Sequence, residues 1–112
     1  MNATYIHEGS SIDYTPAADV SAGDVIVQGE LVGVAKLDIK AGTLGALAVV
    51  GVFDFAKATG ASTAISEGLD LYWDESAGEV TTDSASGANK HIGRSIAAAS
   101  DSDAAVRVRM SQ

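Results

Sequence analysis

A short pattern, an aliphatic residue three positions before a glycine, recurs along the chain and opens a run of β-favouring residues each time. Glycine takes the positive φ that a tight turn needs, and the aliphatic residue anchors the turn to the core. The glycines are unequally spaced and the runs that follow them differ, so recurrent turn chemistry explains the pattern better than a solenoid repeat does. The sequence therefore predicts an antiparallel β protein. Three of these segments begin at Val20, Ile39 and Ile65 and place their glycines at Gly23, Gly42 and Gly68.

The third occurrence opens a predicted hairpin over residues 68–82, which holds the only tryptophan of the chain. Leu71 and Trp73 share one face of its first strand and Tyr72 lies on the other, as in a strand with one face on a core. Gly78 supplies the flexible position of the turn. Tyr72 and Trp73 are both candidates for an oligomer interface, whichever faces away from the core, and a core position is favoured for Trp73.

The last run of the chain has a clear period of two. Within residues 104–110, aliphatic residues alternate with the arginines Arg107 and Arg109, which predicts a half-buried strand with a basic outer face. Two arginines in an acidic chain are expected to meet carboxylates across the sheet or across a subunit boundary. They join Tyr72 and Trp73 as candidate oligomer-interface residues.

Two further predicted strands, residues 31–37 and 44–50, are apolar or glycine at both parities. In an antiparallel protein this pattern indicates strands covered on both faces, by a second sheet on one side and by a subunit on the other. Glycines inside aliphatic runs, at Gly33, Gly51 and Gly93, indicate bulges, bends or close backbone approaches. We therefore expect sharply curved strands in a homo-oligomer.

The N-terminal residues are less regular than the rest. Residues 1–14 are polar with isolated large side chains, so we expect an extended arm leading into a first strand. Pro16 removes a backbone donor and places a boundary there. We expect a single domain over residues 1–112, with the arm and first strand in 1–14 and a β core in 15–112. The predicted fold class is all-β, a compact antiparallel β-sandwich or partly open β-barrel.

The composition is strongly acidic. The chain has 15 Asp and Glu residues against 7 Lys and Arg, a formal net charge of -8, and no cysteine. Because non-specific nucleic-acid binding neutralises phosphates with Lys and Arg, this balance argues against a nucleic-acid partner and favours a positively charged partner surface. No apolar run approaches the roughly 20 residues that span a bilayer, and no leader pattern occurs. We therefore expect no membrane partner and synthesis in the cytoplasm.

The sequence offers no catalytic, cofactor-binding or metal-binding candidate. His7 and His91 are far apart, and neither a G-x-S-x-G elbow nor a P-loop occurs. Asp101 and Asp103 match half of a calcium loop, but the glycine and glutamate that complete such a site are missing, which favours a solvated turn. We expect no enzyme and no cofactor.

Several segments together carry a family resemblance. The most specific are LVGVA at residues 31–35, GVF-x-x-x-K at residues 51–57 and LYWD at residues 71–74. From about Tyr5 to Met110 the chain resembles the small tailed-phage family of capsid cement or decoration proteins. Members of this family are sometimes labelled recombinases, and the missing P-loop and acidic charge argue against that label.

The resemblance implies a protein on the outer capsid surface of the virion, made in the host cytoplasm. It implies binding to the major capsid protein of an assembled head, commonly as a trimer, that bridges capsid subunits and stabilises the shell against internal DNA pressure. The arm is the candidate capsid contact, because a loosely patterned segment orders on a partner and adds a strand to its sheet edge. The candidate contact residues are Ala3, Thr4, Tyr5, Ile6 and His7.

A second hypothesis comes from a different class of protein. A host-surface or glycan-binding module displayed on the virion would use an exposed Tyr72 and the loops at residues 57–66 and 83–90. Stoichiometric co-sedimentation with emptied heads favours the cement protein, whereas binding to cells or glycans without heads favours the receptor-binding module.

Overall fold

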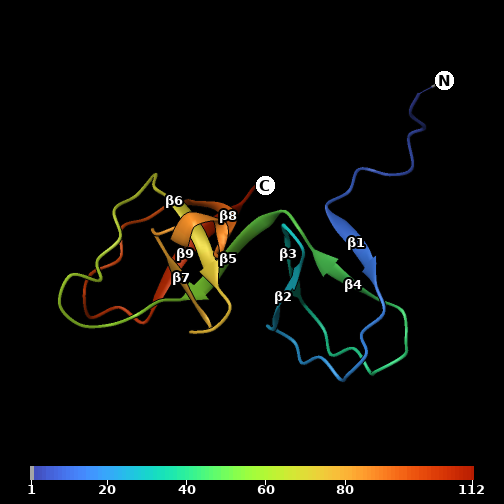
Figure 1. Cartoon of the computed structure of the whole chain (residues 1–112), viewed down its shortest axis with the longest axis horizontal. Helices are drawn as coiled ribbons and strands as arrows, with labels where there is room; N and C mark the ends of the chain where they lie inside the picture. The colour runs from blue at the N-terminus through green and yellow to red at the C-terminus, as the bar shows by residue number, and fades with distance from the viewer. Residues whose placement is uncertain (1) are drawn as a thin grey trace.

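The protein consists of two antiparallel β-sheets packed on each other, as the computed structural model of residues 2–112 shows (Figure 1). Met1, the first residue of the predicted arm, lies outside the described residues. The four-stranded sheet contains β1 (Ser11–Tyr14), β2 (Val25–Gln28), β3 (Leu31–Ala35) and β4 (Gly45–Ala48), in the order β1-β4-β3-β2. The five-stranded sheet contains β5 (Gly51–Ala56), β6 (Asp70–Asp74), β7 (Glu79–Thr81), β8 (Lys90–Ser95) and β9 (Ala105–Met110), in the order β5-β9-β8-β6-β7. A 3-10 turn, η1 (Ala85–Gly87), lies in the loop before β8.

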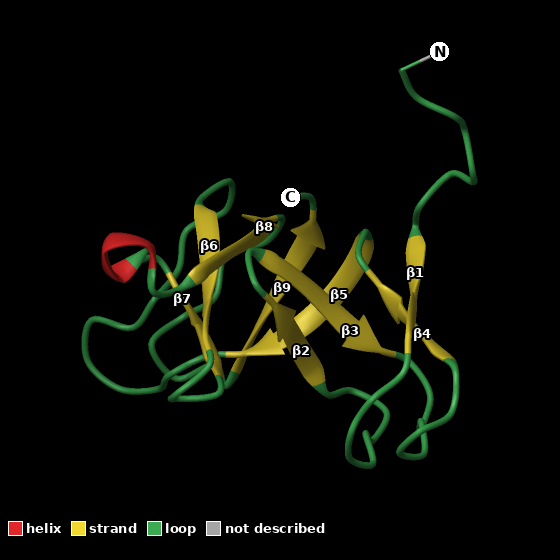
Figure 2. Cartoon of the chain, turned by 45° about the vertical axis from the view of Figure 1, so that its right-hand side comes forward, coloured by secondary structure: helices red, strands yellow, loops and turns green. Residues whose placement is uncertain are grey.

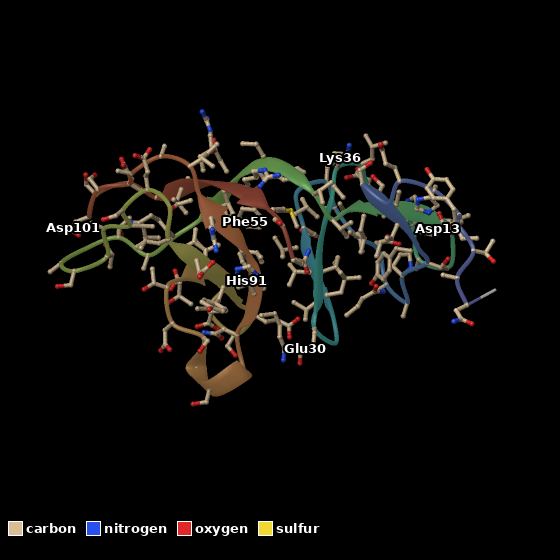
Figure 3. The ribbon with its side chains drawn as sticks, turned by 90° about the horizontal axis from the view of Figure 1, so that it is seen from above. Asp13, Glu30, Lys36, Phe55, His91 and Asp101 are labelled. Atoms are coloured by element: carbon tan, nitrogen blue, oxygen red, sulfur yellow. The ribbon has the colours of Figure 1, made fainter. Side chains whose placement is uncertain are left out.

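This architecture confirms the predicted all-β class with two packed antiparallel sheets. The edges β5 and β7 of the five-stranded sheet approach each other at one isolated parallel bridge between Lys57 and Val80. A single bridge is not a ladder, so the sheet does not close into a barrel. The two ends of the molecule are far apart along its long axis, with Asp13 near one and Asp101 near the other (Figure 3).

The recurrent turns anchor the sheets as the sequence predicts. Val20 and Ile39 are buried and exchange two backbone hydrogen bonds of 2.8 Å each. Ile65 is buried too and exchanges bonds of 2.9 and 2.8 Å with Ala99, a fourth anchor that has no glycine after it and that the pattern did not reveal. The three predicted glycines take the expected positive φ, with Gly23 at 92°, Gly42 at 76° and Gly68 at 83°. Each turn therefore joins a core anchor to a strand entry.

The main core lies between the two sheets. Val32 and Val34 of β3 belong to the same buried cluster as Leu71 and Trp73 of β6, and the Trp73 ring meets Phe55 edge-on with centroids 6.0 Å apart. The alternation predicted for the last strand is confirmed, since its aliphatic side chains are buried and its arginines exposed. The remaining members of this core are Ile65, Val80, Ile92, Ala99, Val106, Val108 and Met110.

A second, smaller core covers the opposite face of β3. Ala35 packs there with Leu47 of β4 and with the anchors Val20 and Ile39. The double apolar face of β3, from which the sequence predicted a subunit contact, is thus covered by its own chain. The predicted strands 31–37 and 44–50 are longer than β3 and β4: Leu37 is 76% exposed and Leu44 is 70% exposed, and both lie in the connection between these two strands.

Glycine allows the close approaches that curve the sheets. Gly93 has φ 152°, and a Cβ on it would lie 2.0 Å from the carbonyl oxygen of Arg109. Its strand carries an irregularity, where the register of β6 against β8 shifts between Leu71 and Tyr72. A Cβ on Gly33 would lie 2.8 Å from the Cβ of Leu47. The predicted bulges and close approaches are confirmed at these two glycines.

Candidate capsid-binding and subunit-contact surfaces

The N-terminal arm, residues 2–10, is extended and leaves the body of the protein before β1 (Figure 2). The predicted contact residues Ala3, Thr4, Tyr5, Ile6 and His7 are all exposed, as is the rest of the arm except the half-buried Gly9. Tyr5 is 81% exposed and Ile6 is 78% exposed, the highest values among the large apolar side chains of residues 2–112. The arm therefore presents apolar surface that no other described part of the chain covers.

The strand that follows the arm has an open edge. β1 pairs with β4 on one side and is the terminal strand of its sheet, so its other backbone edge has no strand partner among residues 2–112. An open edge next to an extended segment is suited to pairing with a strand of another chain. The arm and β1 together form a candidate strand-addition site.

A second candidate surface is the outer face of the five-stranded sheet, which is the face turned away from the core. Residues directly opposite in a ladder share a face, so the register places Arg109, Arg94 and Asp70 side by side across β9, β8 and β6. Tyr72 lies on the same face, two residues after Asp70. The full outer face comprises Val52, Asp54, Asp70, Tyr72, Asp74, Glu79, Thr81, His91, Arg94, Arg107 and Arg109.

Arg107 forms a cross-strand ion pair on this face. Its Nε donates to Oδ1 of Asp54 at 2.9 Å and its Nη2 donates to Oδ2 at 3.1 Å, between residues directly opposite on β9 and β5. These hydrogen bonds, followed by the charge of the guanidinium, hold the pKa of Asp54 below the ordinary 3.8, although slight burial opposes the shift. They raise the pKa of Arg107 in return. The predicted pairing of an arginine with a carboxylate across the sheet is confirmed for Arg107.

A second ionic cluster lies around Asp70. Its Oδ1 accepts a hydrogen bond from Nε of Arg94 at 3.0 Å and lies 3.2 Å from Nε2 of His91. The bond from Arg94 first, and that from His91 second, hold the pKa of Asp70 below 3.8. The His91 ring also meets Tyr72 edge-on, with centroids 5.5 Å apart. Tyr72 is thus half-buried against its neighbour and does not stand free.

Arg109 differs from the other two arginines of the face. Among residues 2–112 its side chain has no hydrogen-bond or ion-pair partner. Its direct neighbours are Val52 on β5 and Arg94 on β8, so it faces an apolar side chain and a like charge. It borders a recess of about 510 Å³ at this end of the sheet.

The structure brings together three of the four predicted interface residues. Tyr72, Arg107 and Arg109 share the outer face, whereas Trp73 is 8% exposed and belongs to the core of its own chain. The sequence did not reveal that Asp54 and Arg94 belong to this surface. Strand alternation alone would place each of them outward, but only the register shows which of them meet.

Outside these two candidate surfaces, an exposed apolar patch lies at the other end of the molecule. The exposed Leu37 and Leu44 border a recess of about 380 Å³ together with Lys36 and Lys40. The sequence had placed both leucines inside covered strands and so missed this patch.

The acidic pair before β9 has a structural role. Oδ1 of Asp101 accepts hydrogen bonds from the backbone N–H groups of Thr63 and Ala64, and Oδ2 of Asp103 accepts one from Ser100. Within residues 2–112 no three potential metal-binding side chains gather. The predicted reading of these aspartates as a turn agrees with these bonds.

None of the helical structure in the described residues has the length and apolar character of a transmembrane helix. Comparison with curated proteins yields no match. A family model described as phage cement protein matches residues 6–110, which is nearly the whole chain and includes both cores and the outer face. This match confirms the predicted resemblance, and the chain belongs to the phage cement protein family.

Proposed function

We propose that this protein binds the outer surface of an assembled phage head as a trimer and stabilises the shell by bridging subunits of the major capsid protein. It is made in the host cytoplasm, resides on the virion and carries out no catalysis. Membership of the phage cement family supports the capsid association. The single observation that carries the mode of binding is the exposed arm beside the open edge of β1.

The arm binds by strand addition in this proposal. Extended backbone pairs with an exposed sheet edge, and alternate side chains enter pockets of the partner. Burying Tyr5 and Ile6 stabilises the complex by up to about 1.5–3 kcal/mol for each side chain. Part of that gain is offset because the arm loses conformational entropy when it becomes ordered.

The trimer multiplies this weak contact. Three arms on one particle raise the effective local concentration for the second and third contacts, so the oligomer binds far more tightly than one arm does. Opening the shell then requires several contacts to break together. The outer face with Tyr72, Arg107 and Arg109 is the proposed subunit contact, because it is exposed, ordered by ion pairs and on a different sheet from the arm.

Co-sedimentation with emptied phage heads tests the arm. Deleting residues 2–10, or introducing Tyr5→Ser with Ile6→Ser, should abolish binding while the fold and oligomeric state stay unchanged. Leu37→Ser is the matched control, because it removes an equally exposed apolar side chain outside the arm and should leave binding intact. Circular dichroism and light scattering report the fold and the oligomer.

Undiminished head binding by the deletion variant would overturn the role of the arm. Binding of the intact protein to host cells or glycans, with none to heads, would overturn the cement function and favour the receptor-binding module. Tyr72 gives that alternative little support, since it is half-buried against His91 and offers no free aromatic platform.

A further inference from the structure

The outer face of the five-stranded sheet is basic at one end and acidic at the other. Arg109 lies directly opposite Arg94 at the end where β6 begins, and because Arg94 is already paired with Asp70, the unpaired positive charge of this end is that of Arg109. At the far end of β6, Asp74 lies directly opposite Glu79, and Glu75 follows in the exposed turn. Asp70 and Asp74 are four residues apart on β6, so the two ends are separated by about 13 Å.

Each end carries charge that the chain does not neutralise. Like charges directly opposite in a ladder destabilise the sheet. The side chain of Arg109 has no acceptor among residues 2–112, and the side chains of Glu75 and Glu79 have no hydrogen-bond or ion-pair partner there. Asp74 has only a local bond, in which its Oδ1 accepts from the backbone N–H of Ala77. Both ends would therefore gain from an oppositely charged partner.

The shapes of the two ends are also complementary. The basic end borders the recess of about 510 Å³, where Arg109 and Arg94 lie beside Ile96, an aliphatic side chain that is 42% exposed. The acidic end is a tight, exposed turn whose tip has the small side chains Ser76 and Ala77. A recess of this size accommodates several such side chains.

We propose that the turn between β6 and β7 of one copy seats in the Arg109 recess of the next copy, with Glu79 pairing with Arg109. The contact joins two different patches, so it is head-to-tail and closes into a ring when the rotation between copies is one third of a turn. This assignment rests on the trimer of the proposed function and names its contact.

The charge distribution favours a second copy of this chain as the partner that fills the Arg109 recess. A chain of net charge -8 opposes contacts between identical acidic patches, which excludes a symmetric pairing through the acidic end. A head-to-tail contact instead places the acidic end of each copy on the basic end of its neighbour. Both halves of the contact are present on every molecule, and each copy satisfies two neighbours.

A charge-reversal cycle tests the contact. Arg109→Glu and Glu79→Lys should each weaken trimer association about tenfold or more in 50 mM salt, measured by analytical ultracentrifugation, because each places like charges at the contact. The double variant carries both reversals in every chain and should restore association to near the original level. Lys40→Glu, which reverses an exposed charge in the connection between β3 and β4, is the matched control and should leave association unchanged.

Three results would overturn the proposal: a monomeric parent protein, single reversals that associate normally, or a double variant as weak as the single ones. Thermal unfolding of each variant separates loss of association from loss of fold. Head binding is measured on the same samples. A monomer that still binds heads would contradict the proposed subunit contact and leave the capsid-binding role intact. A trimer that does not bind heads would contradict the capsid-binding role and leave the subunit contact intact.

Discussion

Lys57 is a charged side chain that the fold buries without a carboxylate partner. It is 5% exposed, and its Nζ donates to the carbonyl oxygens of Ala58, Ser100 and Asp103 at 2.7, 3.0 and 2.9 Å. Three acceptors match the three donors of an ammonium group. The side chain thus ties the loop after β5 to the loop before β9. The sequence had placed Lys57 at the start of a surface loop, which is wrong for this residue.

Replacing Lys57 with Met should destabilise the protein by about 2–4 kcal/mol, because three buried carbonyl groups lose their donor while the aliphatic stem is kept. Urea denaturation measures the change. Lys36→Met is the control, since Lys36 is exposed and should shift stability by less than about 0.5 kcal/mol. Equal stability of the two variants would show that the buried ammonium is dispensable.

The Asp54–Arg107 pair gives a pH prediction. The pKa of Asp54 lies below its ordinary 3.8 in the folded state, so folding favours the ionised carboxylate. This contribution is fully present above about pH 4 and is lost as the pH falls through the lower folded-state pKa. Arg107→Gln removes the guanidinium, so the pKa of Asp54 should move back up toward 3.8.

A carbon-detected NMR titration of the side-chain carboxyl groups measures that shift. Asp70 is the internal control in the same spectrum, because Arg94 and His91 lower its pKa and neither is changed. An Asp54 titration that is the same with and without Arg107 would contradict the assigned cause.

At the scale of strands, sequence pattern predicted well where one face is buried. The hairpin predicted over residues 68–82 agrees with β6 and β7, and the alternation of the last strand agrees with β9. The pattern failed where apolar residues lie in turns, since Leu37 and Leu44 extend an apolar run without being covered. Periodicity indicates which side chains lie on the same face of a strand. It does not indicate whether another part of the protein covers that face.

The candidate surfaces were predictable in part for a related reason. The arginines were expected on the outer face, and Arg107 was expected to meet a carboxylate. Its partner Asp54 is 53 residues away, so only the register of β5 against β9 identifies it. The pairing of β6 with β8 similarly places Asp70 directly opposite Arg94. Its register shifts between Leu71 and Tyr72, next to the close approach at Gly93. Pairing between strands so far apart in the sequence cannot be predicted from the residues of either strand alone.

The C-terminal residue ties the two sheets together. Oε1 of Gln112 accepts a hydrogen bond from the backbone N–H of Val32 at 2.7 Å, and its Nε2 donates to the carbonyl oxygen of Val32 at 2.6 Å. The side-chain amide thus replaces a strand partner for β3 where its sheet meets the five-stranded sheet. Gln112→Ala should cost about 1–2 kcal/mol in urea denaturation, because both backbone groups of Val32 lose their partner.

Ser111→Ala is the matched control for Gln112, since the structure shows only a backbone bond at Ser111, from its N–H to the carbonyl oxygen of Ile92. A side-chain truncation there should leave stability within about 0.5 kcal/mol. If the two variants unfold at the same urea concentration, the amide of Gln112 does not hold the sheets together.

At the scale of the whole molecule, the two proposed functions, capsid binding and subunit contact, lie on different sheets. The four-stranded sheet carries the arm and the open edge of β1, and the five-stranded sheet carries the polar outer face. Lys90 joins them through an ion pair of 2.9 Å with Glu30. Because the arm and the outer face lie on different sheets, capsid binding and subunit contact can be changed independently. Separate variants are therefore expected to abolish one and keep the other.

The net charge of -8 predicts how head binding responds to salt. An acidic protein that meets a positively charged capsid surface gains attraction that is screened as the Debye length falls from about 10 Å at 0.1 M to about 3 Å at 1 M. Head binding should therefore weaken steadily over this range. The residual binding at 1 M measures the apolar contribution of Tyr5 and Ile6, and the variant Tyr5→Ser with Ile6→Ser should remove it. Ultracentrifugation at each salt concentration separates dissociation of the trimer from release of the capsid. Binding that strengthens with salt in an intact trimer would contradict a positively charged partner and leave the apolar arm as the dominant contact.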